Sequence, residues 1–166
     1  MDALGVAEGS IVADLGAGSG WFTVRLAGRV GPNGHVYAED IQKPMIQAIK
    51  VRVDRLGLTD RVTPVLGTAI DSKLPVPLDA VLIVDAFHEM EQPVALLRNV
   101  AAKLKPDGRI GIVQFTKEGG GPGPAMEDRV DPEEVIRVAN TAGLVLRSRE
   151  TFLKFQYMLV FEKPRS

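Results

Sequence analysis

The segment Asp14-Leu15-Gly16-Ala17-Gly18-Ser19-Gly20 combines a carboxylate with alternating glycines, which suits it to hold a ligand close to the main chain. Glycine adopts backbone angles that other residues avoid and leaves room for a ligand. The G-x-G-x-G spacing differs from the G-x-G-x-x-G of dinucleotide-binding loops, because Trp21 stands where their third glycine would be. No Gly-Lys-Ser/Thr follows the segment, which excludes a Walker-type phosphate loop.

Two acidic residues indicate which ligand the glycine segment prefers. Asp14 would repel a pyrophosphate group and attract a cationic ligand. Asp40 follows the next apolar run and is placed to accept hydrogen bonds from a ribose diol, with capping of the following helix as the alternative role. The bulk of Trp21 is also expected to prevent the close helix–strand packing of a dinucleotide site. Together these residues favour a cationic nucleoside over a dinucleotide.

A second group of reactive side chains follows the most apolar run of the sequence. There Asp85 is expected to face the ligand, and His88 is the residue able to act as a base near neutral pH. Capping or packing of a loop is an equally weighted alternative for His88. Glu89 and Glu91 are expected to lie in solvent, and His35 is expected at the surface, remote from the ligand.

The composition excludes several kinds of chemistry. The chain of 166 residues has no cysteine and two histidines, which rules out disulfides, thiol nucleophiles, iron–sulfur clusters and a Cys- or His-rich metal site. A net charge of −1 predicts no bulk attraction to nucleic acid or to an anionic membrane. No apolar run reaches the roughly 18 residues of a membrane span, and no signal peptide is visible. We therefore expect a cytoplasmic protein without a metal ion.

The order of predicted elements indicates an α/β fold. Apolar runs predict strands over residues 11–15, 35–38, 62–66, 80–84 and 110–115. Apolar residues at helical spacing predict helices over residues 21–29, 45–56 and 93–104. A turn is predicted at residues 105–108. Strands that alternate with helices and are apolar throughout predict one domain, residues 1–166, with a doubly wound parallel sheet covered on both faces.

The last third of the chain has a different pattern. Residues 119–124 form a glycine- and proline-rich loop, and the surrounding segment 117–130 either closes over a substrate or is a mobile loop. Asp131 is predicted as the N-cap of a helix that ends at Gly143. Two further strands, residues 144–149 and 155–161, are predicted to pair as a hairpin.

Four of these segments resemble, in order, the motifs of class I S-adenosylmethionine-dependent methyltransferases. The matching segments are residues 12–20, 36–41, 79–85 and 104–110. The resemblance extends over almost the whole chain and is nearest to the small-molecule branch that includes the ubiquinone and menaquinone biosynthesis enzymes. It implies a Rossmann-like, mostly parallel seven-stranded sheet of order 3-2-1-4-5-7-6 with the last strand antiparallel.

The resemblance implies S-adenosylmethionine as the cofactor. In such a site the glycine segment lines the methionine and ribose parts, Asp14 holds the amino group, Asp40 binds the ribose hydroxyls and Ile41 packs on adenine. Family members often contact the adenine amino group through an acid, whereas this sequence has Thr68 there, so that Thr68, the Ala69 main chain and Asp71 stay open as alternatives. The implied cofactor-binding residues are Asp14, Gly16, Ala17, Gly18, Gly20, Asp40, Ile41, Thr68, Ala69 and Asp85.

The expected reaction is methyl transfer to a small-molecule acceptor, with His88 and Asp85 as candidate catalytic residues. Such a transfer depends mainly on alignment, and a base is needed only if the acceptor loses a proton. The Asp/Asn-Pro-Pro-aromatic signature of nucleobase methylation is absent, so no nucleic acid partner is expected. Two alternatives are a non-catalytic cofactor-binding domain that acts as a sensor or scaffold, and a nicotinamide-dependent oxidoreductase, which the glycine spacing disfavours.

The expected first strand begins about ten residues after Met1, whereas family members generally carry N-terminal helices that cover the site. The expectation is a shortened chain, an open site, or a homo-oligomer in which another subunit covers this side. The aromatic residues Trp21, Phe22 and Tyr37 are expected to serve packing rather than to contact the acceptor.

Overall fold

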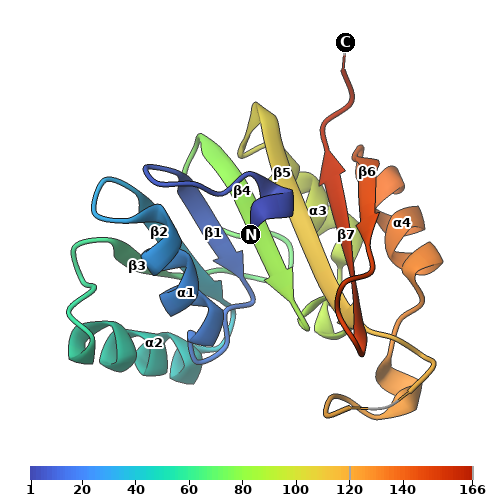
Figure 1. Cartoon of the computed structure of the whole chain (residues 1–166), viewed down its shortest axis with the longest axis horizontal. Coiled ribbons are helices and arrows are strands. Elements are labelled where there is room, and N and C mark those ends of the chain that lie inside the picture. Colours follow the sequence, from blue (N-terminus) through green and yellow to red (C-terminus); the bar gives the residue numbers. More distant parts are fainter. Residues whose placement is uncertain (120, 166) are drawn as a thin grey trace.

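The computed structural model describes residues 1–119 and 121–165, which form one seven-stranded sheet with helices on both faces (Figure 1). Gly120, in the predicted glycine-rich loop, and Ser166 lie outside the described residues. The strands are β1 Ile11–Leu15, β2 His35–Asp40, β3 Val62–Leu66, β4 Leu78–Val84, β5 Leu104–Phe115, β6 Val145–Glu150 and β7 Gln156–Glu162. The α-helices are α1 Trp21–Val30, α2 Lys43–Arg55, α3 Pro93–Ala101 and α4 Pro132–Thr141, and the 3-10 turns are η1 Asp2–Leu4, η2 Phe87–Glu89 and η3 Met126–Asp128.

The strand order is β3-β2-β1-β4-β5-β7-β6, which confirms the predicted topology. Strands β1 to β5 pair in parallel, and β7 runs antiparallel to both β5 and β6, so the predicted C-terminal hairpin is also confirmed. Several predicted boundaries are shifted, including these three. Strand β2 continues to Asp40, helix α3 ends at Ala101, and β5 begins at Leu104.

The prediction of a turn at residues 105–108 is wrong. These residues lie inside β5 as an irregularity, where the pairing with β4 shifts register between Leu78 and Ala80. Lys105 Nζ donates to Asp79 Oδ1 at 2.8 Å and so ties the irregular segment back to β4. Pairing on the neighbouring strand therefore keeps residues in the sheet that local turn propensity would release.

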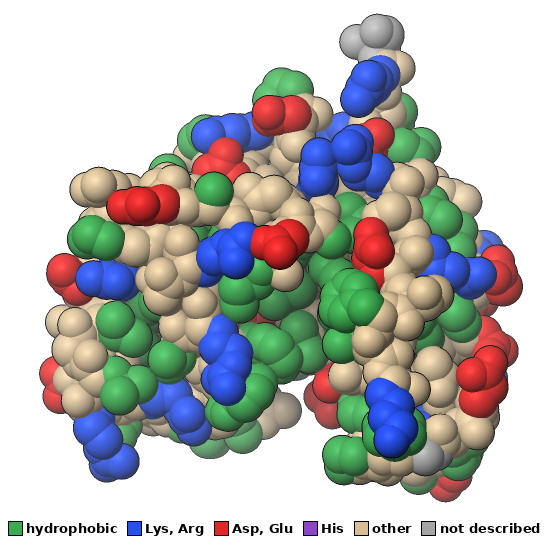
Figure 2. Space-filling view, viewed as in Figure 1, with side chains coloured by type: hydrophobic (Ala, Val, Ile, Leu, Met, Phe, Trp, Pro, Cys, Tyr) green, Lys and Arg blue, Asp and Glu red, His purple; other side chains and the backbone are tan. Residues whose placement is uncertain are grey.

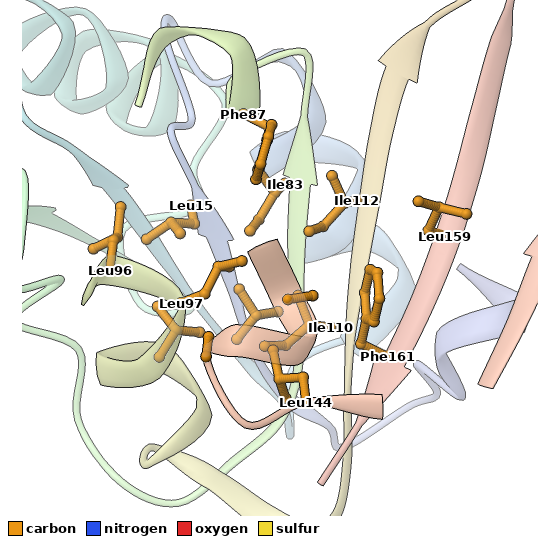
Figure 3. Close-up of a cluster of buried hydrophobic side chains, with 14 of the residues drawn as sticks. Leu15, Ile83, Phe87, Leu96, Leu97, Ile110, Ile112, Leu144, Leu159 and Phe161 are labelled. Atoms are coloured by element: carbon orange, nitrogen blue, oxygen red, sulfur yellow. The ribbon is translucent and has the colours of Figure 1, made fainter. Parts of the chain in front are cut away.

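Each face of the sheet carries its own apolar core. On one face Leu26 of α1 and Ile49 of α2 pack on the strands, together with Leu4 of η1. On the other face α3 and α4 contribute Leu97 and Val138. Each fully buried leucine or isoleucine stabilises the fold by about 1.5–3 kcal/mol. Figure 3 shows part of the second core, with labelled side chains that include Leu15, Ile83, Ile110, Ile112 and Phe161.

The carboxyl ends of the parallel strands meet at one edge of the sheet, the lower edge in Figure 1. The loops that follow β1, β2, β3, β4 and β5 therefore all open at this edge. Figure 2 shows that the molecular surface is hollowed along it, between the side that carries α1 and α2 and the side that carries the β6–β7 hairpin. Ligands of open α/β sheets bind at this position.

Gly34, in the loop between α1 and β2, has no room for a side chain. A Cβ there would lie 2.4 Å from Val30 Cβ and 2.7 Å from the carbonyl oxygen of Ser10. We expect Gly34→Ala to lower the free energy of unfolding by roughly 1–3 kcal/mol, measured by urea denaturation. Gly28→Ala is the matched control, because Gly28 is exposed on α1 and a Cβ added there would meet no neighbouring atom within 4 Å. This substitution should raise the free energy of unfolding by about 0.5–1 kcal/mol. Equal stability of the two variants would contradict this close approach.

Candidate functional site

The glycine loop after β1 is bound by two consecutive acidic residues at the end of β2. The Gly16 amide donates to Glu39 Oε1 at 3.2 Å, the Ala17 amide to the Glu39 carbonyl oxygen at 2.8 Å, and the Gly18 amide to Asp40 Oδ2 at 3.0 Å. Gly16 and Gly18 adopt left-handed φ values of 71° and 59°, which favour glycine. We call this set of three hydrogen bonds the loop clamp.

The loop clamp determines which charge the loop can receive. In phosphate-binding loops the main-chain amides point at the anion. Here the amides of residues 16–18 already donate to protein oxygens, and the nearby side chains Asp14, Glu39 and Asp40 are acidic. The loop therefore disfavours a pyrophosphate and favours a cation, in agreement with the ligand predicted from the sequence.

The predicted steric role of Trp21 is wrong. Its side chain is 49% exposed and does not lie between the helix and the strand. The ring instead contacts Phe22 edge-to-face, and the Arg25 guanidinium lies 3.3 Å from the ring centroid. Phe22 and Tyr37 do pack against the two cores, as expected. The preference against a dinucleotide thus rests on the loop clamp and not on the bulk of Trp21.

Asp14 and Glu39 are buried acids directly beneath the glycine loop. Both side chains are 2% exposed. Burial raises the pKa of Asp14 to about 7, although a 2.8 Å hydrogen bond from Thr23 Oγ1 acts in the opposite direction. Burial likewise raises the pKa of Glu39 to about 8, against the effect of the Gly16 amide and assisted by the negative charges of Asp40 and Asp14. A carboxyl group buried without a cation favours its neutral form.

Asp40 uses both carboxylate oxygens in hydrogen bonds to main-chain amides. Its Oδ1 accepts the Gln42 amide at 2.9 Å, which braces the start of α2, and its Oδ2 accepts the Gly18 amide in the loop clamp. Each carboxylate oxygen keeps a further lone pair that can accept a ribose hydroxyl. Beside it Ile41 is 51% exposed and offers apolar surface for a purine ring. The predicted ribose-binding function of Asp40 and the stacking function of Ile41 stay predictions that this geometry fits.

The loop after β3 contains the three candidates for the adenine contact. Thr68 and Asp71 form a turn, in which the Thr68 amide donates to the Asp71 carbonyl oxygen at 2.8 Å and Thr68 Oγ1 accepts the Asp71 amide at 3.0 Å. The Asp71 carboxylate accepts the Lys73 amide at 2.9 Å and Asn99 Nδ2 at 3.3 Å, and these bonds lower its pKa. Thr68 Oγ1 and Asp71 Oδ1 are therefore both engaged within this loop, and the three alternatives for the adenine contact stay predictions.

Asp85 and His88 join a polar network with two glutamines that the sequence analysis missed. Gln156 Nε2 lies 3.0 Å from both carboxylate oxygens of Asp85. Gln114 Nε2 lies 3.2 Å from His88 Nδ1, and Gln114 Oε1 accepts the Phe87 amide at 3.1 Å. Because Oε1 of Gln114 is bound to a donor, its Nε2 must be the group that donates to His88.

This network separates the two candidate catalytic residues. His88 Nδ1 accepts from Gln114, so the ring proton is on Nε2, which faces Glu89 Oε1 at 3.6 Å. With its lone pair occupied, His88 is poorly placed to act as a base. Asp85 adopts a left-handed φ of 54°, unusual for a residue with a side chain, and burial raises its pKa while the Gln156 hydrogen bond lowers it. Asp85 is the better candidate for contact with an acceptor.

A cavity of about 680 Å³ opens beside Gln156, the partner of Asp85. Buried Arg129 fixes the ends of the loop between β5 and α4, since its guanidinium donates to the carbonyl oxygens of Thr116 and Pro124 at 3.1 Å. Asp131 begins α4 as predicted, but its carboxylate pairs with a lysine side chain rather than capping the helix. The lining includes Thr116, Lys117, Asp131, Arg149, Lys154 and Gln156.

Three site residues that the sequence analysis missed, Glu39, Gln114 and Gln156, differ in how far the sequence indicates them. Glu39 and Gln114 are polar residues near the carboxyl ends of strands that are covered on both faces, and a polar side chain buried in a two-sided core must find a partner. That signal is visible in the sequence. Gln156 is found only from the antiparallel register that places it opposite Phe115 at the end of β5.

The described residues contain neither a cluster suited to a metal ion nor a helix suited to span a membrane. Within residues 1–119 and 121–165, no group of three or more His, Asp or Glu side chains is arranged to hold a metal ion. In the same ranges, no helix is both long enough and apolar enough to cross a bilayer.

The chain is similar in sequence to known methyltransferases. Residues 12–108 match a family described as a methyltransferase domain. Over 120 residues the chain is 32% identical to the ubiquinone/menaquinone biosynthesis C-methyltransferase UbiE of Pasteurella multocida. This match covers 70% of the chain and 44% of that relative, so the chain spans about half the length of the curated relatives it matches.

Solved structures share the fold. A SAM-dependent methyltransferase from Aquifex aeolicus superposes with a TM-score of 0.90 at 27% identity, over 96% of this chain and 85% of that one. The O-methyltransferase NcsB1 of neocarzinostatin biosynthesis, in complex with S-adenosyl-L-homocysteine and 1,4-dihydroxy-2-naphthoic acid, superposes with a TM-score of 0.79 at 21% identity. That match covers 93% of this chain and 49% of NcsB1, and it shows likeness of fold.

Replacement of Asp40 should affect cofactor binding strongly. Asp40→Ala removes the carboxylate that is predicted to accept the ribose hydroxyls, together with its bonds to Gly18 and Gln42, so the affinity for S-adenosylmethionine should fall by about tenfold or more in titration calorimetry. Asp54→Ala is the matched control, since Asp54 is exposed on α2, and its affinity should equal that of the wild type. Unchanged affinity of Asp40→Ala would remove Asp40 from the site.

The buried acids predict how stability depends on pH. Because the pKa values of Asp14 and Glu39 rise from 3.8 and 4.5 to about 7 and about 8 on folding, the folded chain binds more protons than the unfolded chain between these limits. The free energy of unfolding should therefore decrease as the pH rises from 5.5 to 8.5. A decrease of roughly 5 kcal/mol is expected in urea denaturation, since the two groups together titrate over about four pH units in this interval and each unit corresponds to about 1.4 kcal/mol. A flat profile would contradict the raised pKa values.

Proposed function

The chain belongs to the class I S-adenosylmethionine-dependent methyltransferase family, and we propose that it transfers the methyl group of S-adenosylmethionine to a small-molecule acceptor. The loop clamp carries this proposal, because it leaves a glycine loop surrounded by carboxyl groups in which the amides of residues 16–18 donate to Glu39 and Asp40 and not to a phosphate. The relatives named for ubiquinone and menaquinone biosynthesis support a small-molecule acceptor. A fold by itself would not fix the reaction.

The residues of the site fit this cofactor. The loop residues Gly16 to Gly18 form the floor, and a Cβ on Gly18 would meet no atom within 4 Å, which leaves open space above the loop. Asp40 and Ile41 provide the ribose acceptors and an apolar surface for adenine. When bound, S-adenosylmethionine supplies a methyl group on a positively charged sulfur, so the protein needs chiefly to align donor and acceptor.

On the acceptor side, Asp85 takes the proton that a hydroxyl or an activated carbon of the acceptor loses, and the acceptor occupies the cavity beside Gln156. The volume of about 680 Å³ is within the range of small-molecule pockets. Gln156 holds the Asp85 carboxylate, and Gln114 holds His88. In this assignment His88 positions the segment after β4 and is not the base. The homo-oligomer and the cytoplasmic location expected from the sequence stay predictions.

The function is tested first by binding and then by turnover. Titration calorimetry should show binding of S-adenosylmethionine and S-adenosylhomocysteine and none of NAD. A screen of cell-extract metabolites for transfer of a labelled methyl group should then identify an acceptor. Binding of NAD without S-adenosylmethionine would contradict the proposed function. Cofactor binding without any acceptor would favour the sensor or scaffold alternative.

Two isosteric substitutions distinguish the candidate catalytic residues. Asp85→Asn keeps the size and tolerates the left-handed backbone, but it cannot take a proton, so turnover should fall by about 100-fold or more. His88→Gln keeps a polar contact with Gln114 and should lower turnover by less than about tenfold. Rates of labelled-methyl transfer measure both effects. The reverse order of the two losses would assign the proton transfer to His88.

A further inference from the structure

Glu39 is a buried carboxyl group with a partner for one of its two oxygens. Its Oε1 accepts the Gly16 amide, whereas its Oε2 is buried with no hydrogen-bond partner among the described residues. Gly67 leaves the space for Oε2, since a Cβ at residue 67 would lie 2.2 Å from that oxygen. A buried oxygen without a donor is costly as an anion, which favours a proton on Oε2.

No protein cation balances the acids under the loop. Asp14 faces Glu39 from β1, Asp40 is its neighbour on β2, and the nearest residue after β3, Gly67, is uncharged. Among residues 1–119 and 121–165, no Lys, Arg or His forms an ion pair with Asp14, Glu39 or Asp40. Buried carboxylates are normally paired with a cation or are protonated. The site therefore has a deficit of positive charge that a cationic ligand can fill.

Glu39 is the acid best placed to change its protonation when that ligand binds. Asp40 accepts a main-chain amide at each of its two carboxylate oxygens. Asp14 has a hydrogen bond from the Thr23 hydroxyl. Glu39 has the unpartnered oxygen, and its pKa of about 8 keeps it protonated at neutral pH. Its Oε1 is one hydrogen bond below Gly16, a floor residue of the proposed cofactor site.

Resting on the proposed binding of S-adenosylmethionine, we propose that Glu39 is a positioning residue that responds to the charge of the cofactor. Glu39 is a neutral acid in the ligand-free chain, and its O–H bond breaks when the cationic cofactor binds. The proton goes to the solvent, and the carboxylate that remains still accepts the Gly16 amide. Because S-adenosylhomocysteine has an uncharged sulfur, its binding releases fewer protons per bound molecule. Glu39 thus favours the methyl donor over the demethylated product.

The test counts protons rather than turnover. Titration calorimetry at pH 6.5 in phosphate and in imidazole, which differ in ionisation enthalpy, gives the number of protons released on binding. We expect the wild type to release close to one proton with S-adenosylmethionine and clearly less with S-adenosylhomocysteine. Between pH 6 and 7 the affinity for S-adenosylmethionine should rise by up to about tenfold, because binding that releases a proton strengthens as the pH increases.

Glu39→Gln is the decisive variant, because it keeps an oxygen for the Gly16 amide and replaces a neutral acid with a neutral amide. It should fold, and its thermal midpoint at pH 6 should lie within about 3 °C of the wild type. Its release of protons should be nearly abolished, and its affinity for S-adenosylmethionine should be lower and independent of pH. Glu91→Gln, at an exposed carboxyl, should behave as the wild type.

The outcomes separate the possible failures. Release of the same number of protons by Glu39→Gln and the wild type would overturn the role of Glu39. Loss of the release in Asp14→Asn, with retention in Glu39→Gln, would assign the proton to Asp14 instead. If Glu39→Gln does not fold, equal proton release by the wild type with the two ligands would overturn the proposal. Failure of the wild type to bind S-adenosylmethionine at all would overturn the proposed function.

Discussion

The loop clamp is the interaction on which the rest of the site depends. Main-chain amides of a loop between a strand and a helix are normally the groups that receive an anion, and here residues 16–18 give theirs to Glu39 and Asp40. The parallel pairing of β1 with β2 makes this possible, because Leu15 lies opposite Glu39 at the point where both strands end. One pairing register thereby sets the shape of the loop and the sign of its charge preference.

The same acids create an electrostatic problem that the ligand can solve. Asp14 and Glu39 are buried without a cation, and burial moves both pKa values toward or above neutrality. In the ligand-free chain, burial therefore favours the protonated form of both carboxyl groups. In our proposal, a cofactor with a positively charged sulfur supplies the missing charge, so that a feature that destabilises the isolated fold favours the methyl donor in the complex. Strain of this kind at a functional site is usual, because function and stability select for different arrangements.

The acceptor side is organised by strands that are distant in sequence. Asp85, directly after β4, accepts a hydrogen bond from Gln156 at the start of β7, and His88 accepts one from Gln114 of β5. The proton on the His88 ring is therefore located by a glutamine rather than by the local sequence. Such side-chain pairs across strands give Asp85 and His88 different surroundings, which their positions in the sequence do not reveal.

The sequence alone determined the order and type of the elements, the glycine loop and the position of Asp40, because apolar periodicity and glycine spacing are local properties. It did not determine that residues 105–108 stay in β5, since pairing with β4 outweighed their turn propensity. Nor did it show that Trp21 is exposed or that Glu39, Gln114 and Gln156 complete the site. Those features depend on which side chains meet across the sheet. Only the tertiary register decides that, because strand partners far apart in sequence are set by packing of the whole fold.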